Sequence, residues 1–191
     1  MTTNIFQGQK VRLRAFEAGD WEAFYTLDQD TEVSRGSYWI PTPRSVAGCQ
    51  RWAEEKAAQA PEGDNFFWVV ETLDGQVVGS VNVIQSNPRM GTFSYGLGLD
   101  SRYHRQGYAT EAVKLVLAYY FRELRYQKCT VYIYAWNEAS IGLHRKLGFT
   151  QEGRLRRMNF SQGAYHDDVV FGMTAEEFEA LYGPGHPSDG G

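Results

Sequence analysis

Cysteine, surplus positive charge and long apolar runs are all scarce in this sequence. Cys49 and Cys129 are its only cysteines, and without a Cys-x-x-Cys pair they indicate neither a disulfide framework nor a zinc cluster. The 19 Lys and Arg residues face 23 Asp and Glu, for a net charge of −4, whereas nucleic-acid-binding proteins usually carry a basic surface. The sequence therefore predicts no metal and no nucleic-acid partner, and an anionic ligand has to be held locally.

Export and membrane signals are missing as well. No window approaches the roughly 18 apolar residues that cross a bilayer, and residues 1–10 lack the apolar core of a signal peptide. We expect a cytoplasmic protein without a membrane partner, either a monomer or a homodimer. The chain of 191 residues, 42% hydrophobic, has the size of one domain. We place this domain at residues 8–182 and expect a disordered tail at 183–191.

Periodicity in the first half of the chain predicts strands and two helices. Residues 11–16 alternate as a strand does, Gly19-Asp20 precedes a helix start, and a second helix is expected from Thr42-Pro43 to about residue 60. Asp74-Gly75 is a hairpin signal. Three runs rich in β-branched and aromatic residues predict an antiparallel meander: 66–72, 76–85 and 92–99.

The second half begins with a helical period. From Ala109 to Leu124 apolar residues recur every three or four positions, which predicts an amphipathic helix. The remaining elements expected from the pattern are a strand at 128–135, a helix at 137–147 ended by Gly148, strands from Phe149 and at 167–173, and a helix at 175–182.

The segment Tyr103–Thr110 lies between a predicted strand and the N-terminus of that helix. The first amides of a helix have no intrahelical partner and lie at the positive end of its dipole, so they favour an anion. Gly107 and Ala109 let a phosphate approach the backbone, and Arg102 and Arg105 add positive charge. A diphosphate fits this place; the alternative is an ordinary turn with two solvated arginines.

This segment resembles the acetyl-CoA motif of the GNAT superfamily, Gln/Arg-x-x-Gly-x-Gly/Ala. Gly107-Tyr108-Ala109-Thr110-Glu111-Ala112 is similar to the form found in its Rim-like branch, the ribosomal-protein-alanine acetyltransferases. His104 stands where the motif has Gln or Arg, which leaves a role for its side chain open. The resemblance implies these cofactor-binding residues: His104, Arg105, Gln106, Gly107, Tyr108, Ala109 and Thr110.

A second motif begins at Asn137. Asn137, Ser140 and His144 share one face of a helix, although Asn137 can be an N-cap and His144 a structural histidine. The run to Phe149 resembles the second CoA motif of the superfamily. That resemblance implies that Asn137 binds the pantetheine arm and that Ser140 lies near the thioester sulfur. Many members have a Tyr at the position of His144, so the general acid is Ser140, His144 or solvent.

The resemblance, which covers residues 8–182, implies the α+β GNAT fold. This is a twisted, mostly antiparallel mixed sheet flanked by helices, whose fourth and fifth strands, here 92–99 and 128–135, splay apart. Backbone groups of Leu97 and Leu99 would then pair with the pantetheine arm. Relatives often carry a Glu where this chain has Ser94. The general base is therefore open among Glu138, Glu152, Asp167 and water.

The function implied is acetyl transfer from acetyl-CoA directly to a primary amine, since neither motif contains a cysteine nucleophile. An α-amine has a lower pKa than an alkylamine, which favours a protein or peptide N-terminus over a small-molecule amine such as a polyamine or an antibiotic. The other alternative is a non-catalytic acyl-CoA-binding module. Tyr38 and Trp39 are the candidate acceptor-binding residues, although Trp39 can instead close the core.

Overall fold

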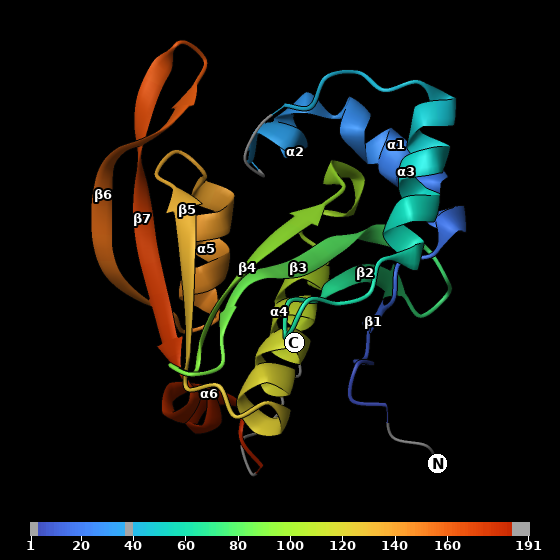
Figure 1. Ribbon diagram of the computed structural model, residues 1–191. Coiled ribbons are helices and arrows are strands. Elements are labelled where there is room, and N and C mark those ends of the chain that lie inside the picture. Colours follow the sequence, from blue (N-terminus) through green and yellow to red (C-terminus); the bar gives the residue numbers. More distant parts are fainter. Residues whose placement is uncertain (1–3, 37–39, 185–191) are drawn as a thin grey trace. The chain divides into compact units, whose positions relative to one another are not determined.

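The computed structural model describes residues 4–36 and 40–184 (Figure 1). Its strands are β1 (Val11–Arg14), β2 (Phe67–Thr72), β3 (Val77–Asn87), β4 (Thr92–Leu99), β5 (Lys128–Tyr134), β6 (Thr150–Ser161) and β7 (Ala164–Thr174). Its α-helices are α1 (Trp21–Gln29), α2 (Thr31–Gly36), α3 (Val46–Ala58), α4 (Tyr108–Ala118), α5 (Glu138–Lys146) and α6 (Ala175–Tyr182). Among the described residues, no helix is long and apolar enough to cross a membrane.

The seven strands follow the order β1-β2-β3-β4-β5-β7-β6. The pairs β1–β2, β2–β3, β5–β7 and β6–β7 are antiparallel. β4 pairs with β5 in parallel at Thr92–Lys128 and Phe93–Cys129. The α+β fold with a mixed sheet and flanking helices is therefore confirmed, while the splay of β4 and β5 beyond these pairs stays a prediction.

The chain forms two compact units. The first contains the described residues of 1–86 and 95–116, and the second contains those of 87–94 and 117–191. In the first unit α1 and α3 pack on β2 through an aromatic cluster, in which the ring of Phe16 lies 5.0 Å from that of Phe24 and 5.3 Å from that of Trp52. Ala53 and Val69 complete this core.

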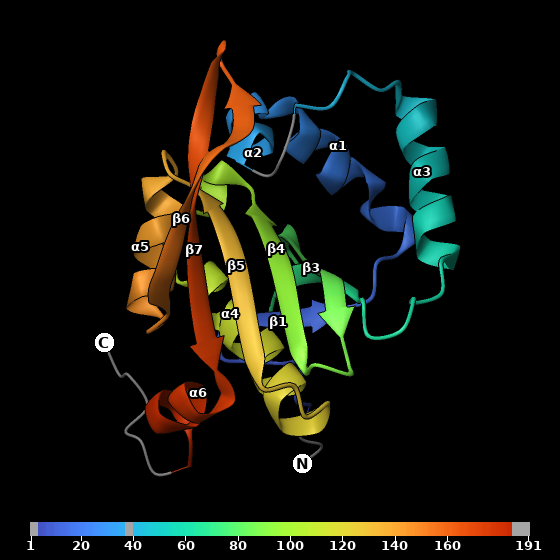
Figure 2. The same ribbon diagram turned by 60° about the vertical axis from the view of Figure 1, so that its left-hand side comes forward.

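The second unit is built on β5, β7 and β6, which lie side by side (Figure 2). After α4 the chain continues as a π-helical turn, η3 (Tyr119–Glu123), which turns Tyr120 and Phe121 into the interior. The Tyr120 ring stacks on Phe93 at 4.2 Å. Helix α5 buries Ile141, His144 and Leu147, and the side of β7 that carries Phe171 faces His144.

Local signals explain where the elements differ from the sequence prediction. The helix expected from Thr42-Pro43 begins at Val46, because Ser45 is its N-cap and its Oγ accepts a hydrogen bond from the Gly48 amide at 3.1 Å. The short helix α2 was not predicted, since its few residues show no apolar period. Residues 185–191 of the expected tail lie outside the described residues.

Candidate functional site

The loop between β4 and α4 is held by its own hydrogen bonds. The Asp100 side chain accepts a hydrogen bond from the Arg102 amide at 2.9 Å, and the His104 Nε2 atom lies 3.1 Å from the Leu99 carbonyl oxygen. Arg105 has φ +61° and Gly107 has φ +85°, a left-handed backbone that is costly for a side chain such as Arg. His104 therefore braces the loop through its ring, and the Leu99 carbonyl predicted to pair with pantetheine already has a partner.

The N-terminus of α4 presents unpaired helix amides as the sequence predicts. The first intrahelical bond runs from the Glu111 amide to the Gly107 carbonyl at 3.1 Å. The amides of Tyr108, Ala109 and Thr110 precede it, so they have no intrahelical acceptor and point toward the helix N-terminus. This geometry can bind a diphosphate.

The positive charge at this loop comes partly from a residue that the sequence did not indicate. Arg102 is committed to Asp100, with Nε 3.0 Å from the carboxylate, and this ion pair lowers the pKa of Asp100. Lys10, which precedes β1, instead places its Nζ 3.1 Å from the Gln106 carbonyl. An open hollow of about 400 Å³ borders the loop and is lined by Lys10, Gln106 and Tyr108 together with the β2–β3 turn.

Glu111 connects the motif to the N-terminal segment. Its carboxylate accepts hydrogen bonds from the amides of Gln9, Lys10 and Val11 at 2.8, 2.7 and 2.7 Å. Gly8 makes room for it, because a Cβ there would lie 2.4 Å from the Glu111 carboxyl carbon. Glu111 of the motif thus fixes the N-terminal segment to α4 and keeps Lys10 beside the loop.

The second unit brings the three residues of the other motif together. Asn137 caps α5, its Oδ1 accepting from the Ser140 amide at 3.0 Å. The Ser140 Oγ lies 3.4 Å from the His144 Nδ1, and this same nitrogen is 2.8 Å from the Ser140 carbonyl oxygen. The predicted common face is present, with Asn137 serving as the N-cap.

His144 lies in the interior of the second unit. Its exposed fraction is 4%, and its ring meets Phe149 edge-on at 5.1 Å. Burial lowers its pKa because the charged imidazolium would lose its hydration. These are the surroundings of a neutral structural histidine, and the role of general acid stays a prediction for His144 and for Ser140.

Two of the carboxylates considered as the general base are held in ion pairs. Glu152 accepts from Lys128 at 2.6 Å, and Asp167 accepts from Arg154 at 2.7 Å. The bond from Arg154 lowers the pKa of Asp167. Tyr38 and Trp39, the predicted acceptor-binding residues, lie outside the described residues, and Leu97 is half-buried in β4.

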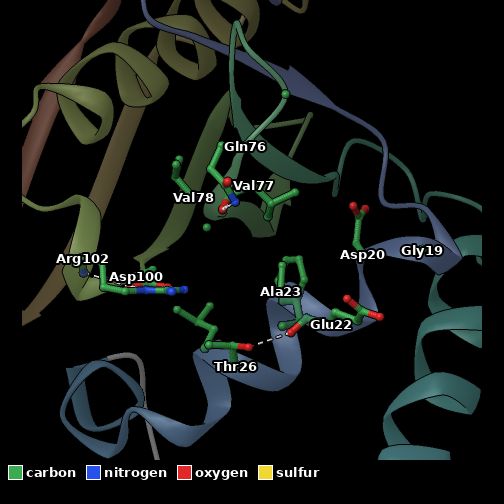
Figure 3. A pocket seen from close by; sticks show the side chains of 14 residues that line it. Gly19, Asp20, Glu22, Ala23, Thr26, Gln76, Val77, Val78, Asp100 and Arg102 are labelled. Carbon is green, nitrogen blue, oxygen red and sulfur yellow. Dashed lines mark hydrogen bonds and ion pairs between the residues drawn. The ribbon is translucent and has the colours of Figure 1, made fainter.

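A separate cavity of about 340 Å³ lies in the first unit between α1 and the β2–β3 turn (Figure 3). Its carboxylates include Asp20, which is paired with Arg14, and Asp100, which is paired with Arg102. Arg102, whose charge was expected at the phosphate site, lines it, but none of residues 104–110 and neither Ser140 nor His144 does. The charges of Asp20 and Asp100 on its wall are thus compensated by internal ion pairs.

Comparison with known proteins identifies the family. The model of the acetyltransferase (GNAT) domain matches residues 10–150. The SPbeta prophage-derived uncharacterized N-acetyltransferase YokL of Bacillus subtilis (strain 168) is 37% identical over 183 residues, which are 96% of this chain and 100% of that protein. The spermidine N(1)-acetyltransferase of Escherichia coli (strain K12) is 30% identical over 159 residues, 83% of each chain.

Solved structures agree on the fold. The crystal structure of spermidine N-acetyltransferase from Vibrio cholerae in complex with CoA and spermine has a TM-score of 0.75 at 22% identity, covering 90% of this chain and 99% of that one. An acetyltransferase structure from T. thermophilus has a TM-score of 0.76 at 26% identity, covering 92% of this chain and 91% of that one. Since the family model matches most of the chain, the protein belongs to the GNAT family and is an acetyl-CoA-dependent N-acetyltransferase.

Proposed function

We propose that this enzyme passes the acetyl group directly from acetyl-CoA to a primary amine, with the CoA diphosphate bound at residues 104–110. The observation that carries the proposal is the N-terminus of α4. There, unpaired amides, the left-handed Gly107 and the Lys10 ammonium group meet at one loop. A diphosphate would accept hydrogen bonds from the amides and be neutralised by the cation.

Direct transfer is supported by the state of the two cysteines. Cys49 is 2% exposed and Cys129 is fully buried, and burial raises the pKa of the Cys129 thiol. A buried thiol of raised pKa is a poor nucleophile, because the thiolate is the reactive form. No acetyl-cysteine intermediate is therefore proposed. Asn137 and Ser140 would hold the pantetheine arm and the thioester end of the cofactor.

Two acceptor classes follow from different observations. The Gly107–Ala112 match to the Rim-like branch favours the α-amine of a protein or peptide. The relative named spermidine N(1)-acetyltransferase favours a polyamine. Both acceptors present a primary amine that is protonated in water.

The test is release of CoA thiol from acetyl-CoA with spermidine, propylamine and short peptides with free N-termini, with each product identified by mass. We expect a mass increase of one acetyl group on at least one amine. If the protein binds acetyl-CoA tightly but turns over no member of the panel, it is an acyl-CoA-binding module and the proposal is wrong.

A further inference from the structure

One buried carboxylate in the described residues has no cationic partner. Four acidic residues are buried: Asp20, Glu71, Asp100 and Asp168. Arg14 pairs with Asp20 and Glu71, and Arg102 pairs with Asp100. Asp168, 9% exposed, has only a neutral partner, the Asn159 amide, which donates to its Oδ1 at 2.6 Å. Because a buried carboxylate is stable only when it is compensated, Asp168 lacks the positive charge that the others have.

The strand register places Asp168 on the side of β7 that faces away from α5. Phe171 contacts His144 of α5, and side chains alternate along a strand, so Asp168 points to the opposite side. It lies across from Tyr134 of β5. The Ala135 amide donates to the Asp167 carbonyl at 2.9 Å, so the next pair, Tyr134 and Asp168, is of the closer, non-hydrogen-bonded kind.

Tyr134, which lies opposite Asp168 in the strand register, carries a stacked aromatic ring. The Trp136 ring stacks on Tyr134 at 5.3 Å with an interplanar angle of 23°. Aromatic faces attract cations through their quadrupole, and a neighbouring carboxylate adds charge attraction. The combination of Asp168 with the Tyr134 ring is thus suited to an ammonium group.

Within the part of the chain that the structure describes, two buried polar side-chain atoms of the second unit have no hydrogen-bond partner: the Asn159 Oδ1 and the Trp136 Nε1. The Asn159 Nδ2 donates to the Asp168 carboxylate. The unpaired Oδ1 of the same amide therefore lies next to that carboxylate. The Asp168 Oδ2, which is not among these buried atoms and so reaches solvent, has no hydrogen-bond partner among the described residues. Unpaired buried polar atoms are costly, and acceptors left open beside a carboxylate fit a ligand that donates hydrogen bonds.

The position along the chain connects this group to the acetyl transfer. The Asn137 amide donates to the Tyr134 carbonyl at 2.8 Å. Asp168 lies opposite Tyr134, the last residue of β5, and the chain continues from there into α5. Asn137 and Ser140, which are proposed to hold the cofactor arm, lie at the start of this helix.

We infer that Asp168 and Asn159, beside the Tyr134 ring, bind the protonated amine of the acceptor. This rests on the proposed function, to which it adds the residues that receive the acceptor amine as a cation. An ammonium group donates to the Asp168 Oδ2 and the Asn159 Oδ1 and supplies the missing charge. Burial raises the pKa of Asp168, and a bound ammonium group would oppose that shift because it favours the charged carboxylate.

The test measures binding of spermidine and of propylamine to the CoA-loaded protein by calorimetry, which needs no turnover. We expect Asp168→Asn to weaken amine binding about 10- to 100-fold, as for a lost charged hydrogen bond, and to leave CoA binding unchanged. Propanol, which has no charge, should bind neither protein. In steady-state assays the same variant should raise the KM for the amine while the KM for acetyl-CoA stays constant.

The matched control is Asp167→Asn at the next position, where the carboxylate is committed to Arg154. It should keep amine binding within about twofold of the unaltered protein, which excludes general disruption of β7. Equal amine affinity in Asp168→Asn and the unaltered protein, or no amine binding by the latter, would overturn the inference. Amine binding that depends on Asp168 without any acetyl transfer would instead overturn the proposed function alone.

Discussion

The loop before α4 and the end of β5 differ in whether their polar side chains have hydrogen-bond partners within the protein. At the loop, internal partners engage Glu111, His104 and Lys10: three backbone amides, the Leu99 carbonyl and the Gln106 carbonyl. At the end of β5 and in β6, the Trp136 Nε1 and the Asn159 Oδ1 have no hydrogen-bond partner among the described residues. In the first region these side chains have internal partners and the open donors are backbone amides of α4, whereas in the second region buried side-chain atoms are left without hydrogen bonds.

This difference matches what each region is proposed to bind. A loop that binds the same diphosphate in every reaction binds it more tightly if it is rigid beforehand, because binding then costs little conformational entropy. An acceptor site gains specificity when its buried polar groups are paired only by the correct ligand, since a ligand lacking the group leaves them unpaired. Substitutions in the loop should therefore affect stability and cofactor binding together, and substitutions at the β5 end should separate stability from acceptor binding.

The largest effect is expected for Gly107→Glu. The new side chain would need φ +85° and would place its Cβ 3.1 Å from the Lys10 Nζ, and its carboxylate would repel a diphosphate. We expect CoA affinity to fall at least about 100-fold, measured by calorimetry.

Gly163→Glu is the control for backbone strain and charge. Gly163 in the β6–β7 turn has φ +78°, and a Cβ there meets nothing within 4 Å. It should lose stability on the order of 1 kcal/mol, as a side chain forced to positive φ does, and bind CoA normally. Retained CoA affinity in Gly107→Glu would show that the cofactor loop is wrongly placed.

Glu111→Ala comes next. Three amides that now bond to the carboxylate would lose their acceptor, so we expect the free energy of unfolding to fall by about 2 kcal/mol. CoA affinity should fall roughly tenfold, because Lys10 would no longer be held beside Gln106. Chemical denaturation and calorimetry measure the two quantities.

Glu123→Ala removes an exposed carboxylate from η3 and should change stability by less than about 0.5 kcal/mol. If Glu111→Ala lowered stability but left CoA affinity intact, Glu111 would not position the loop.

The sequence predicts the loop at residues 104–110 but not the contact of Glu111 with residues 9–11 that holds Lys10 beside it. Gly107, Ala109 and the helix after them form a local pattern, so spacing alone indicates an anion site. Lys10 meets the loop only after folding brings residues about a hundred positions apart together, and no local pattern reports such a contact. The strand 92–99 was predicted with its observed bounds, because β-branched and aromatic residues define it locally.

Asp168 was not singled out, for a similar reason. The stretch 165–168 was considered as a border of the acceptor cleft, but no local signal marks Asp168 within it. In the sequence it is one of two adjacent aspartates, and Asp167 was the one considered as a base. Its burial depends on pairing with β5 and on an irregularity in β6, where the three residues between Leu155 and Asn159 oppose a single residue of β7. That irregularity brings Asn159 to the Asp168 carboxylate, and side-chain alternation alone does not predict it.

A smaller effect is expected from the buried histidine. Because the pKa of His144 is lower in the folded protein than the ordinary value of about 6.5, the native state binds fewer protons than the unfolded chain just below that pH. The contribution of neutral His144 to the free energy of unfolding is fully present above about pH 6.5 and is lost as the pH falls toward the pKa of His144 in the folded protein. His144→Gln, which cannot titrate, should show a smaller loss of unfolding free energy between pH 8 and pH 5.5. An equal loss in both proteins would assign the pH dependence to other groups.

The smallest change in stability is expected for Asp168→Asn, and it separates the two regions most sharply. The pKa of Asp168 is raised in the folded protein, so its contribution to stability is present below about pH 4 and is lost as the pH rises through the folded pKa. At pH 7 the variant should therefore unfold at a temperature equal to or above that of the unaltered protein, and this advantage should vanish near pH 4. A carboxylate whose removal costs no stability but weakens amine binding is retained for its ligand, whereas a marked loss of stability at pH 7 would make Asp168 a structural group like Glu111.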